Sequence, residues 1–301
     1  MRISGIRKSK GEKLFLAVNN LILFFLGMLT LFPFYVVAVQ SFAPPEDFIF
    51  KEIILWPSRF DFSYFRIVFG KASTIYDAYK ATIYITVIGT MVNMILTVVT
   101  AYALSKKTLP FRKQITLFMV FTMYFGGGMV PGYLLVRSLH LIDSLWALIL
   151  PGAISTYLVL IMRNFIMGIP KEIMEAATID GCSEIVQLVR IIVPLSIPSI
   201  ATVSLFYAVG HWNEFSGGLL YINKPELAPL QVYLRHVLYD ATQLESEFQD
   251  LAILYAEGRY KPPSDAIKSA TIMAATVPII LVYPFIQKYF VKGMTIGSLK
   301  G

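Results

Sequence analysis

The 301-residue sequence has little of the chemistry on which enzymes and metal proteins depend. It contains one cysteine, Cys182, and three histidines, and only 15% of its residues are charged. A single cysteine excludes an internal disulfide bond. The histidines are scattered along the chain and show neither metal-ligand spacing nor a Ser/His/Asp arrangement. We therefore predict no catalytic residue, no metal site and no cofactor on this chain.

The phosphate-binding loop GxxxxGK[ST] is also missing. The cluster Gly126 to Gly128 lies in an apolar stretch and is not followed by lysine and serine or threonine. The long apolar stretches are nearly free of charged side chains, whereas proton-coupled transporters carry acids and bases within their spans. The chain is thus predicted not to be an enzyme, and any energy for transport has to come from a partner.

Apolar residues dominate what is present, at 56% of the chain. A transmembrane helix needs about 20 predominantly apolar residues, and six stretches contain such a run. The sequence therefore predicts an all-α membrane protein with six transmembrane helices. The spans are placed at about 14–42, 79–105, 114–136, 144–163, 194–219 and 267–288.

The distribution of basic residues sets the expected orientation. Five lysine and arginine residues precede the first apolar stretch, which is too long for the apolar region of a signal peptide and is read as an uncleaved span. Six spans place both termini on one side, and the positive-inside rule makes that side the cytoplasm. Segments 1–13 and 291–301 are then cytoplasmic. The net charge of +7 reports this topology and contact with the lipid bilayer, so no nucleic-acid partner is expected.

The inner segment between the fourth and fifth spans is patterned as two short helices. Pro170 suits a first helical turn, and good helix formers follow over 171–179. Asp180 and Gly181 predict a sharp reversal, after which Ser183 can cap a second helix. That helix is predicted to be amphipathic, with Ile185, Leu188, Val189 and Ile192 on one face and Glu184, Gln187 and Arg190 on the other.

These residues resemble a known motif. The run Glu175-Ala176-Ala177-Thr178-Ile179-Asp180-Gly181, followed by Ile191-Ile192-Val193-Pro194, is similar to the EAA motif of ATP-binding-cassette (ABC) importer permeases, which usually have leucine where Val193 stands. The resemblance implies the type I ABC importer permease fold over residues 14–290, with 168–193 as the coupling loop that docks on an ATPase. We define the coupling loop by those residues.

The resemblance also implies roles for single residues of the coupling loop. Glu175 would bond polar or basic groups of the ATPase, Ala176 and Ala177 would permit close approach, and Asp180 and Gly181 would shape the turn. Ile191 and Pro194 belong to the closing part of the motif. The alternative is an amphipathic hairpin that lies on the lipid surface without a partner.

A second motif ends the fifth span. Trp212, Asn213, Glu214 and Phe215 resemble the WN(D/E)F segment of sugar-importing members of this family, and the last 19 residues resemble multi-sugar permeases. Aromatic rings and polar tips bind a sugar by stacking and hydrogen bonds, which makes these four residues a candidate substrate path. The alternative is an interfacial aromatic belt with a solvated acid.

The family resemblance implies a set of partners. These are a second homologous permease, two ATPase subunits that carry ATP and Mg²⁺, an extracytoplasmic solute-binding protein and an oligosaccharide substrate, in the bacterial cytoplasmic membrane. The long outer segment 223–266 is expected either to help dock the binding protein or to be a solvated loop. Two other functions remain open at this stage: an ABC permease for a non-sugar solute, and a secondary transporter or membrane scaffold.

Overall fold

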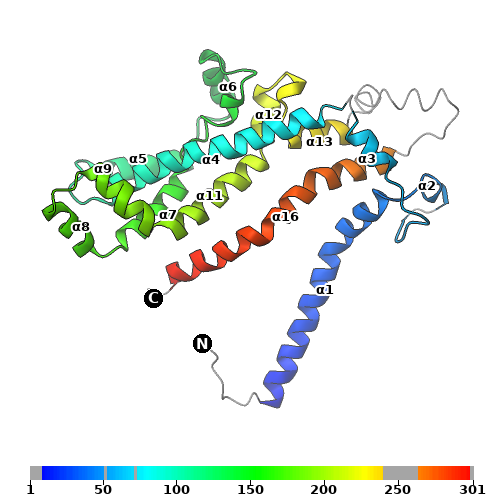
Figure 1. The fold of residues 1–301 in the computed structure, drawn as a ribbon, viewed down its shortest axis with the longest axis horizontal. Coiled ribbons are helices and arrows are strands. Elements are labelled where there is room, and N and C mark those ends of the chain that lie inside the picture. Colours follow the sequence, from blue (N-terminus) through cyan, green and yellow to red (C-terminus); the bar gives the residue numbers. More distant parts are fainter. Residues whose placement is uncertain (1–8, 51–52, 71–72, 240–263, 299–301) are drawn as a thin grey trace. The chain divides into compact units, whose positions relative to one another are not determined.

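The computed structural model describes residues 9–50, 53–70, 73–239 and 264–298, and these residues form helices and connecting turns without a β-strand. Their contacts divide the chain into two units, which are considered separately below. One unit contains residues 1–73 and 244–274, and the other contains 74–243 and 275–301. Figure 1 shows the helices with their labels. The prediction of an all-α protein is confirmed.

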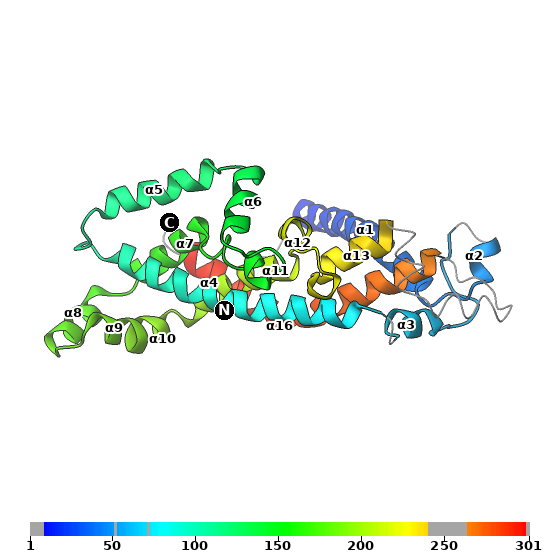
Figure 2. The same ribbon diagram turned by 90° about the horizontal axis from the view of Figure 1, so that it is seen from above.

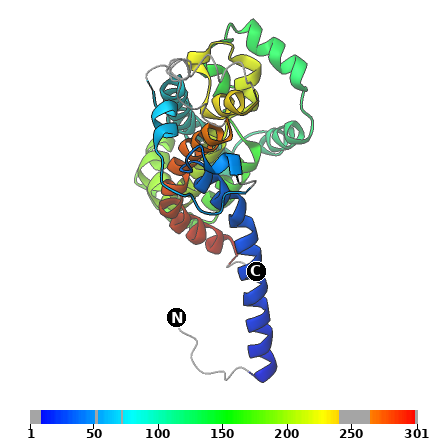
Figure 3. The ribbon, with the colours of Figure 1, turned by 90° about the vertical axis from the view of Figure 1, so that its right-hand side faces the viewer.

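The first unit is dominated by α1 (Lys10–Gln40), which contains the predicted span 14–42 except for its last two residues and is drawn as one unbroken helix in Figure 3. The hydroxyl of Ser9 caps it by accepting the N–H of Glu12 at 3.1 Å. Most apolar side chains along α1 are exposed, as lipid-facing residues are in an isolated subunit. Two short helices follow, α2 (Asp47–Phe50) and α3 (Ser63–Val68).

The second unit is organised around α4 (Ile75–Ser105), which contains the predicted span 79–105. α7 (Thr156–Met167) and α11 (Ile197–Trp212) pack along it, as Figures 1 and 2 both show. The three helices share one apolar core. Its buried members are Met94, Val98, Ala101, Tyr102 and Leu104 from α4, Leu158, Val159, Met162 and Ile166 from α7, Val203 and Tyr207 from α11, and Ile192.

The predicted span 114–136 is broken into two helices. α5 (Arg112–Tyr124) and α6 (Met129–Ser138) meet at an angle of 112° (Figure 2). Gly128, between them, has a φ of +86°, a conformation that favours glycine. A Cβ on Gly126 or Gly128 would meet no atom within 4 Å, so these glycines permit the bend and do not make room for a neighbouring helix.

The predicted span 144–163 is not one continuous helix either. A short 3₁₀ turn, η1 (Leu145–Leu148), leads through Pro151 and Gly152 to α7. The 12 residues of α7 rise by about 18 Å, less than the hydrocarbon thickness of about 30 Å. The predicted span 194–219 contains α11, which meets the preceding helical segment, 184–195, at 83°.

The last long helix is α16 (Ser264–Ser298), which contains the predicted span 267–288. By length and composition, three helices among the described residues can cross a membrane, or up to five if each bent pair is one span. Six spans are therefore not confirmed and stay a prediction, as do the domain boundaries. Much of the long outer segment, 240–263, lies outside the described residues.

The outer end of the second unit contains α12 (Ser216–Tyr221), η3 (Pro225–Leu227) and α13 (Leu230–Tyr239). Asp143 joins this region to the end of the α6 segment. Its N–H donates to the carbonyl of Tyr221 at 2.9 Å, and its carboxylate accepts the N–H groups of Asn223 and Lys224 at 2.5 and 3.2 Å. The N–H of Asn223, with smaller help from that of Lys224, lowers the pKa of Asp143 below its usual 3.8.

This tie should depend on pH in a defined direction. A depressed folded-state pKa means that the carboxylate stabilises the fold above pH 3.8 and loses this effect as pH falls through the lower folded value. We expect Asp143→Ala to accelerate amide hydrogen exchange at Asn223 and Lys224 several-fold at neutral pH. Asp143→Asn keeps an acceptor oxygen, so its effect should be smaller and free of the acid transition. Wild-type exchange rates in the alanine variant would contradict this role.

Candidate functional site

The first helix of the coupling loop forms where the sequence predicted it. α8 spans Lys171–Ile179, and Pro170 is its N-cap, one position before the first helical turn. Asp180 ends the helix by donating its N–H to the carbonyl of Ala176 at 2.9 Å. Gly181 then has a φ of +76°, which any side chain would strain. Local signals alone therefore specify this helix and its turn.

The motif residues of α8 face different ways. Glu175 and Ala176 are exposed, whereas Ala177 is buried against the rest of the unit. Ile179 is 86% exposed at the end of the helix. Of the closing residues, Ile191 is half-buried and Pro194 is exposed. The exposed residues of α8 form an open surface, while Ala177 holds the helix to its own unit.

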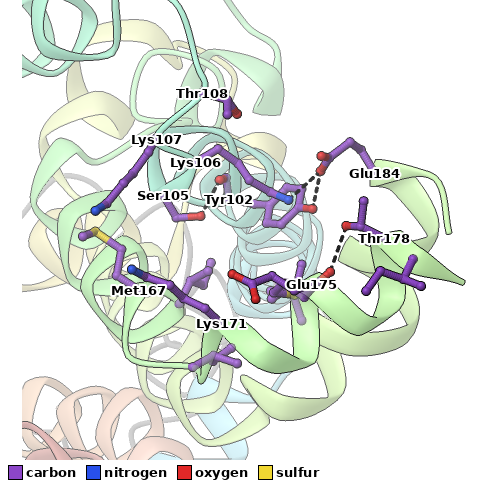
Figure 4. Close-up of a pocket in the computed structure, with 15 residues that line it drawn as sticks. Tyr102, Ser105, Lys106, Lys107, Thr108, Met167, Lys171, Glu175, Thr178 and Glu184 are labelled. Atoms are coloured by element: carbon purple, nitrogen blue, oxygen red, sulfur yellow. Dashed lines mark hydrogen bonds and ion pairs between the residues drawn. The ribbon is translucent and has the colours of Figure 1, made fainter. Parts of the chain in front are cut away.

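Glu175 lines a cleft of about 820 Å³ between α8 and the end of α4 (Figure 4). Lys106 and Lys107 line the cleft from the loop after α4, and Lys171 lines it from α8. The cleft therefore combines the exposed motif acid Glu175 with the basic side chains of Lys107 and Lys171 and an apolar floor, while the charge of Lys106 is taken up by Glu184, which also lines the cleft. This arrangement suits a polar or charged side chain of a docking protein.

The second helix of the coupling loop differs from the prediction. α9 (Glu184–Gln187) runs directly into a π-helical turn (Leu188–Ile192) and α10 (Val193–Leu195). Ser183 precedes α9 as predicted, but its hydroxyl makes no capping bond. The predicted amphipathic faces are right for Leu188 and Ile192, which pack on the core, and for Glu184 and Arg190, which are exposed. They are wrong for three residues: Gln187 is only 2% exposed, while Ile185 and Val189 are 75% and 58% exposed.

Gln187 is buried because its amide is fully used. Its Nε2 donates to Thr178 Oγ1 at 3.1 Å and to the carbonyl of Cys182 at 3.0 Å. Its Oε1 accepts from Lys106 Nζ at 3.3 Å and lies 3.5 Å from the Tyr102 hydroxyl, whose single proton is shared with Glu184. A buried polar group with its bonds satisfied is stable, and leaving its partners unpaired costs about 1–3 kcal/mol for each. Gln187 thus joins α8, the turn and α4.

Glu184 completes this contact. Its Oε2 accepts a hydrogen bond from the Tyr102 hydroxyl and pairs with Lys106 Nζ at 2.9 Å (Figure 4). Lys106 also lies over the Tyr102 ring, 4.8 Å from its centroid. We call Tyr102, Lys106, Glu184 and Gln187 the fastening cluster. It was not predicted, although Tyr102 and Lys106 stand four residues apart at a helix end, which places them on one face.

The electrostatics of the fastening cluster keep its ion pair charged over a wide pH range. Hydrogen bonds from Tyr102 and Lys106 lower the pKa of Glu184. Burial by itself would lower the pKa of Lys106, but its bonds to Tyr102 and Glu184 outweigh this and raise it. The contribution of Glu184 is therefore lost only as pH falls below 4.5, and that of Lys106 only as pH rises above 10.5.

A second feature is a cavity of about 500 Å³ at the other end of α11. Asn93 of α4 is 1% exposed and donates its Nδ2 to the carbonyl of Gly152 at 3.1 Å. His211 Nε2 lies 3.4 Å from Asn93 Oδ1. About one helical turn away along α4 and α11, the Tyr207 hydroxyl contacts Thr97 Oγ1 at 2.8 Å and accepts the N–H of Ser155 at 3.0 Å. The cavity therefore has a polar wall within an apolar helix pack.

The four residues of the candidate substrate path do not act as one group. Glu214 lines the cavity, and its Oε1 accepts the N–H of Gly217 at 2.8 Å at the start of α12. Asn213 donates its Nδ2 to the carbonyl of Val209 at 2.9 Å and so ends α11. Trp212 keeps a buried Nε1 without a partner among the described residues, and Phe215 is 38% exposed.

The structure therefore brings Glu214 together with His211 and Asn93 at the cavity, while Trp212, Asn213 and Phe215 do not line it. Asn93 was missed in the sequence. Its signal was an amide in the middle of an apolar stretch, where an unpaired polar group is costly.

Known proteins resemble this chain over most of its length. Residues 67–296 match the family model described as "Binding-protein-dependent transport system inner membrane component". The chain is 41% identical over 275 residues to the polygalacturonan/rhamnogalacturonan transport system permease protein YtcP of Bacillus subtilis, covering 91% of this chain and 94% of that protein. It is 42% identical to protein LplC of the same organism, covering 99% of each.

A solved structure is also similar. A chain of a bacterial ABC transporter involved in the import of the acidic polysaccharide alginate superposes with a TM-score of 0.86 and 29% sequence identity. The match covers 95% of this chain and all of that one.

Proposed function

Because the chain belongs to the family of binding-protein-dependent transport system inner membrane components, we propose that it is the carbohydrate permease subunit of an ABC importer. Its similarity to a polygalacturonan/rhamnogalacturonan permease and to a chain of an alginate importer supports a substrate of the oligosaccharide class. The observation that carries the proposal is the pairing of an exposed EAA helix, α8, with a polar cavity at the far end of α11.

The coupling loop is the proposed contact with an ATPase subunit. Exposed Glu175, Ala176 and Ile179 form a surface that combines an acid, a small residue and an apolar side chain. The importer would then contain two ATPase subunits, which bind ATP and Mg²⁺, a second homologous permease and an extracytoplasmic solute-binding protein. Both termini and the coupling loop would lie in the cytoplasm, which agrees with the distribution of basic residues.

The cavity is the proposed stretch of the substrate path through this subunit. Asn93 and His211 supply hydrogen-bonding atoms, Glu214 supplies a carboxylate, and Phe206 and Tyr221 supply aromatic surface. Sugars present hydroxyl groups and apolar ring faces, so a lining of this kind suits them. Closure of the ATPases would move the helices around the cavity and expose it to one side of the membrane at a time.

Reconstituted transporter tests this function directly. Proteoliposomes that contain the cognate permease pair, ATPases and binding protein should accumulate labelled oligosaccharides only when ATP is present. Amino acids, peptides and phosphate esters in the same assay should not accumulate. Transport of a non-sugar solute without any saccharide uptake would overturn the proposal.

The place of Glu214 in the cavity wall leads to a further prediction, which concerns the solute concentration needed for uptake. Glu214→Gln keeps an oxygen for the Gly217 N–H and nearly the same volume, so α12 should stay capped. It loses the charge-assisted bonds to sugar hydroxyls, which are roughly twice as strong as neutral ones. We expect the half-saturating solute concentration for uptake to rise about tenfold, equivalent to ~1.4 kcal/mol.

Glu226→Gln is the matched control, because Glu226 is an exposed acid of η3 outside the cavity. An unchanged concentration dependence in Glu214→Gln would place the substrate path elsewhere.

A further inference from the structure

The coupling loop is separated from the helices on either side of it by breaks in the chain. Before α8, the helix α7 ends at Met167, and Gly168 to Pro170 are not helical. After α10, the helical segment turns by 83° at Ser196 before α11 begins. With a hinge at each end, a displacement of the coupling loop is transmitted only weakly along the backbone to α7 and α11, because the chain can bend at the hinges instead.

Side-chain contacts connect the coupling loop directly to α4 and its surroundings, without passing through either break in the chain. Apolar contacts of Met174, Leu188 and Ile192 join the coupling loop to the core of the second unit. Such contacts are non-directional and fix no single register between the two surfaces. The directional contacts are those of the fastening cluster, in which Tyr102 of α4 and Lys106, the residue directly after α4, hold Glu184 and Gln187 of α9.

Gln187 extends this connection into α8 through Thr178 and the turn carbonyl of Cys182. The surface of α8 is thereby joined to the end of α4 by an unbroken chain of hydrogen bonds. Farther along α4 stands Asn93, a wall residue of the cavity. An α-helix transmits displacement along its axis well, since each turn is held by backbone hydrogen bonds.

We propose that Tyr102, Lys106, Glu184 and Gln187 are positioning residues that make α4 follow the coupling loop when the ATPases close. This inference rests on the proposed docking of α8 to an ATPase. The cluster contacts neither solute nor nucleotide; its role is to convert movement of α8 into movement of the cavity wall.

Lys106→Met tests this role. Glu184 is 67% exposed, and ion pairs with an exposed partner add little stability, so the variant should fold and assemble. In reconstituted transporter we expect the ATPase to co-purify at wild-type stoichiometry and to hydrolyse ATP at near its normal rate. The number of ATP molecules hydrolysed per solute transported should rise at least fivefold.

Two further variants separate positioning from general damage. Lys80→Met removes an ion pair of α4 that lies outside the cleft, Lys80 Nζ to Asp77 Oδ1 at 2.8 Å, and should leave the ATP-to-solute ratio unchanged. The charge exchange Lys106→Glu with Glu184→Lys restores the ion pair but not the bond to Gln187 Oε1, since a carboxylate cannot donate, and should recover only the part of the coupling that the ion pair carries.

Two results would overturn the inference. One is an unchanged ATP-to-solute ratio in Lys106→Met, and the other is loss of the ATPase from that variant, which would make the cluster part of the docking surface. The proposed function fails differently: if Glu175→Lys left ATPase binding and uptake intact, α8 would not be the docking helix, whatever the ratio measured in Lys106→Met.

Discussion

Replacing Glu175 with lysine is expected to remove the ATPase from the purified complex and to abolish ATP-dependent uptake, by at least tenfold in each measurement. Glu175 is exposed on α8 and lines a cleft that already contains Lys106, Lys107 and Lys171. Of these lysines, Lys106 is paired with Glu184, which also lines the cleft. A lysine at position 175 would repel the basic groups that the ATPase is expected to present, and juxtaposed like charges at an interface cost several kcal/mol.

Co-purification on a tagged permease and uptake into proteoliposomes measure the two effects together. Glu172→Lys is the matched control, since Glu172 is an exposed acid of the same helix and does not line the cleft. Losing the Glu172 carboxylate from the first turn should lower the stability of α8 itself by only about 0.3–1 kcal/mol. Normal uptake by Glu175→Lys would favour the alternative of a coupling loop that only rests on lipid.

Gly89→Ala is expected to disrupt the cavity and to lower the free energy of unfolding by about 1–3 kcal/mol. A Cβ at position 89 would lie 2.5 Å from His211 Nε2 and 2.7 Å from its Cε1, whereas Cβ atoms essentially never come within 3.0 Å of such an atom. His211 is only 7% exposed and lines the cavity, so its ring can escape the methyl group only by moving into that cavity. Uptake should fall as well, because His211 contacts Asn93 in the cavity wall.

A double-mutant cycle isolates this clash. Thermal unfolding in detergent would be compared for Gly89→Ala, His211→Ala and the double variant. If the methyl group acts through the imidazole ring, Gly89→Ala should cost almost nothing once His211 is alanine. Gly27→Ala, where a Cβ meets no atom within 4 Å, is the control for adding a methyl group to a long apolar helix. Additive effects in the cycle would show that Gly89 is required for another reason.

The sequence predicted α1, α4 and α16 and the boundaries of α8 because their signals are local. Length and apolar composition are enough to specify a long membrane helix. Pro170 and Gly181 delimit α8 by their own backbone preferences, independent of any neighbour. The glycines at 126–128 likewise indicated that a bend was possible, although its angle of 112° could not be predicted from them.

The orientation of α9 could not be predicted from the sequence, because it depends on hydrogen bonds to residues far away in the chain. Regular 3.6-residue periodicity placed Gln187 on a solvent face, but the π-helical turn that follows changes the register. The bonds of Gln187 to Thr178, Cys182 and Lys106 then favour burial of the amide over burial of Ile185. Periodicity carries no information about a partner 81 residues away.

The sequence by itself determined that this protein is an all-α chain with long apolar helices and that its EAA-like residues form the helix α8, since each of these rests on neighbouring residues. Only the tertiary structure decided which polar side chains come together in the cavity wall and in the fastening cluster. Asn93 and His211 are 118 residues apart and meet because α4 and α11 pack together over a glycine. Tyr102 and Glu184 are 82 residues apart and meet because Gln187 and Lys106 hold the coupling loop against α4. Such contacts follow from packing and hydrogen-bond satisfaction, which local sequence patterns do not encode.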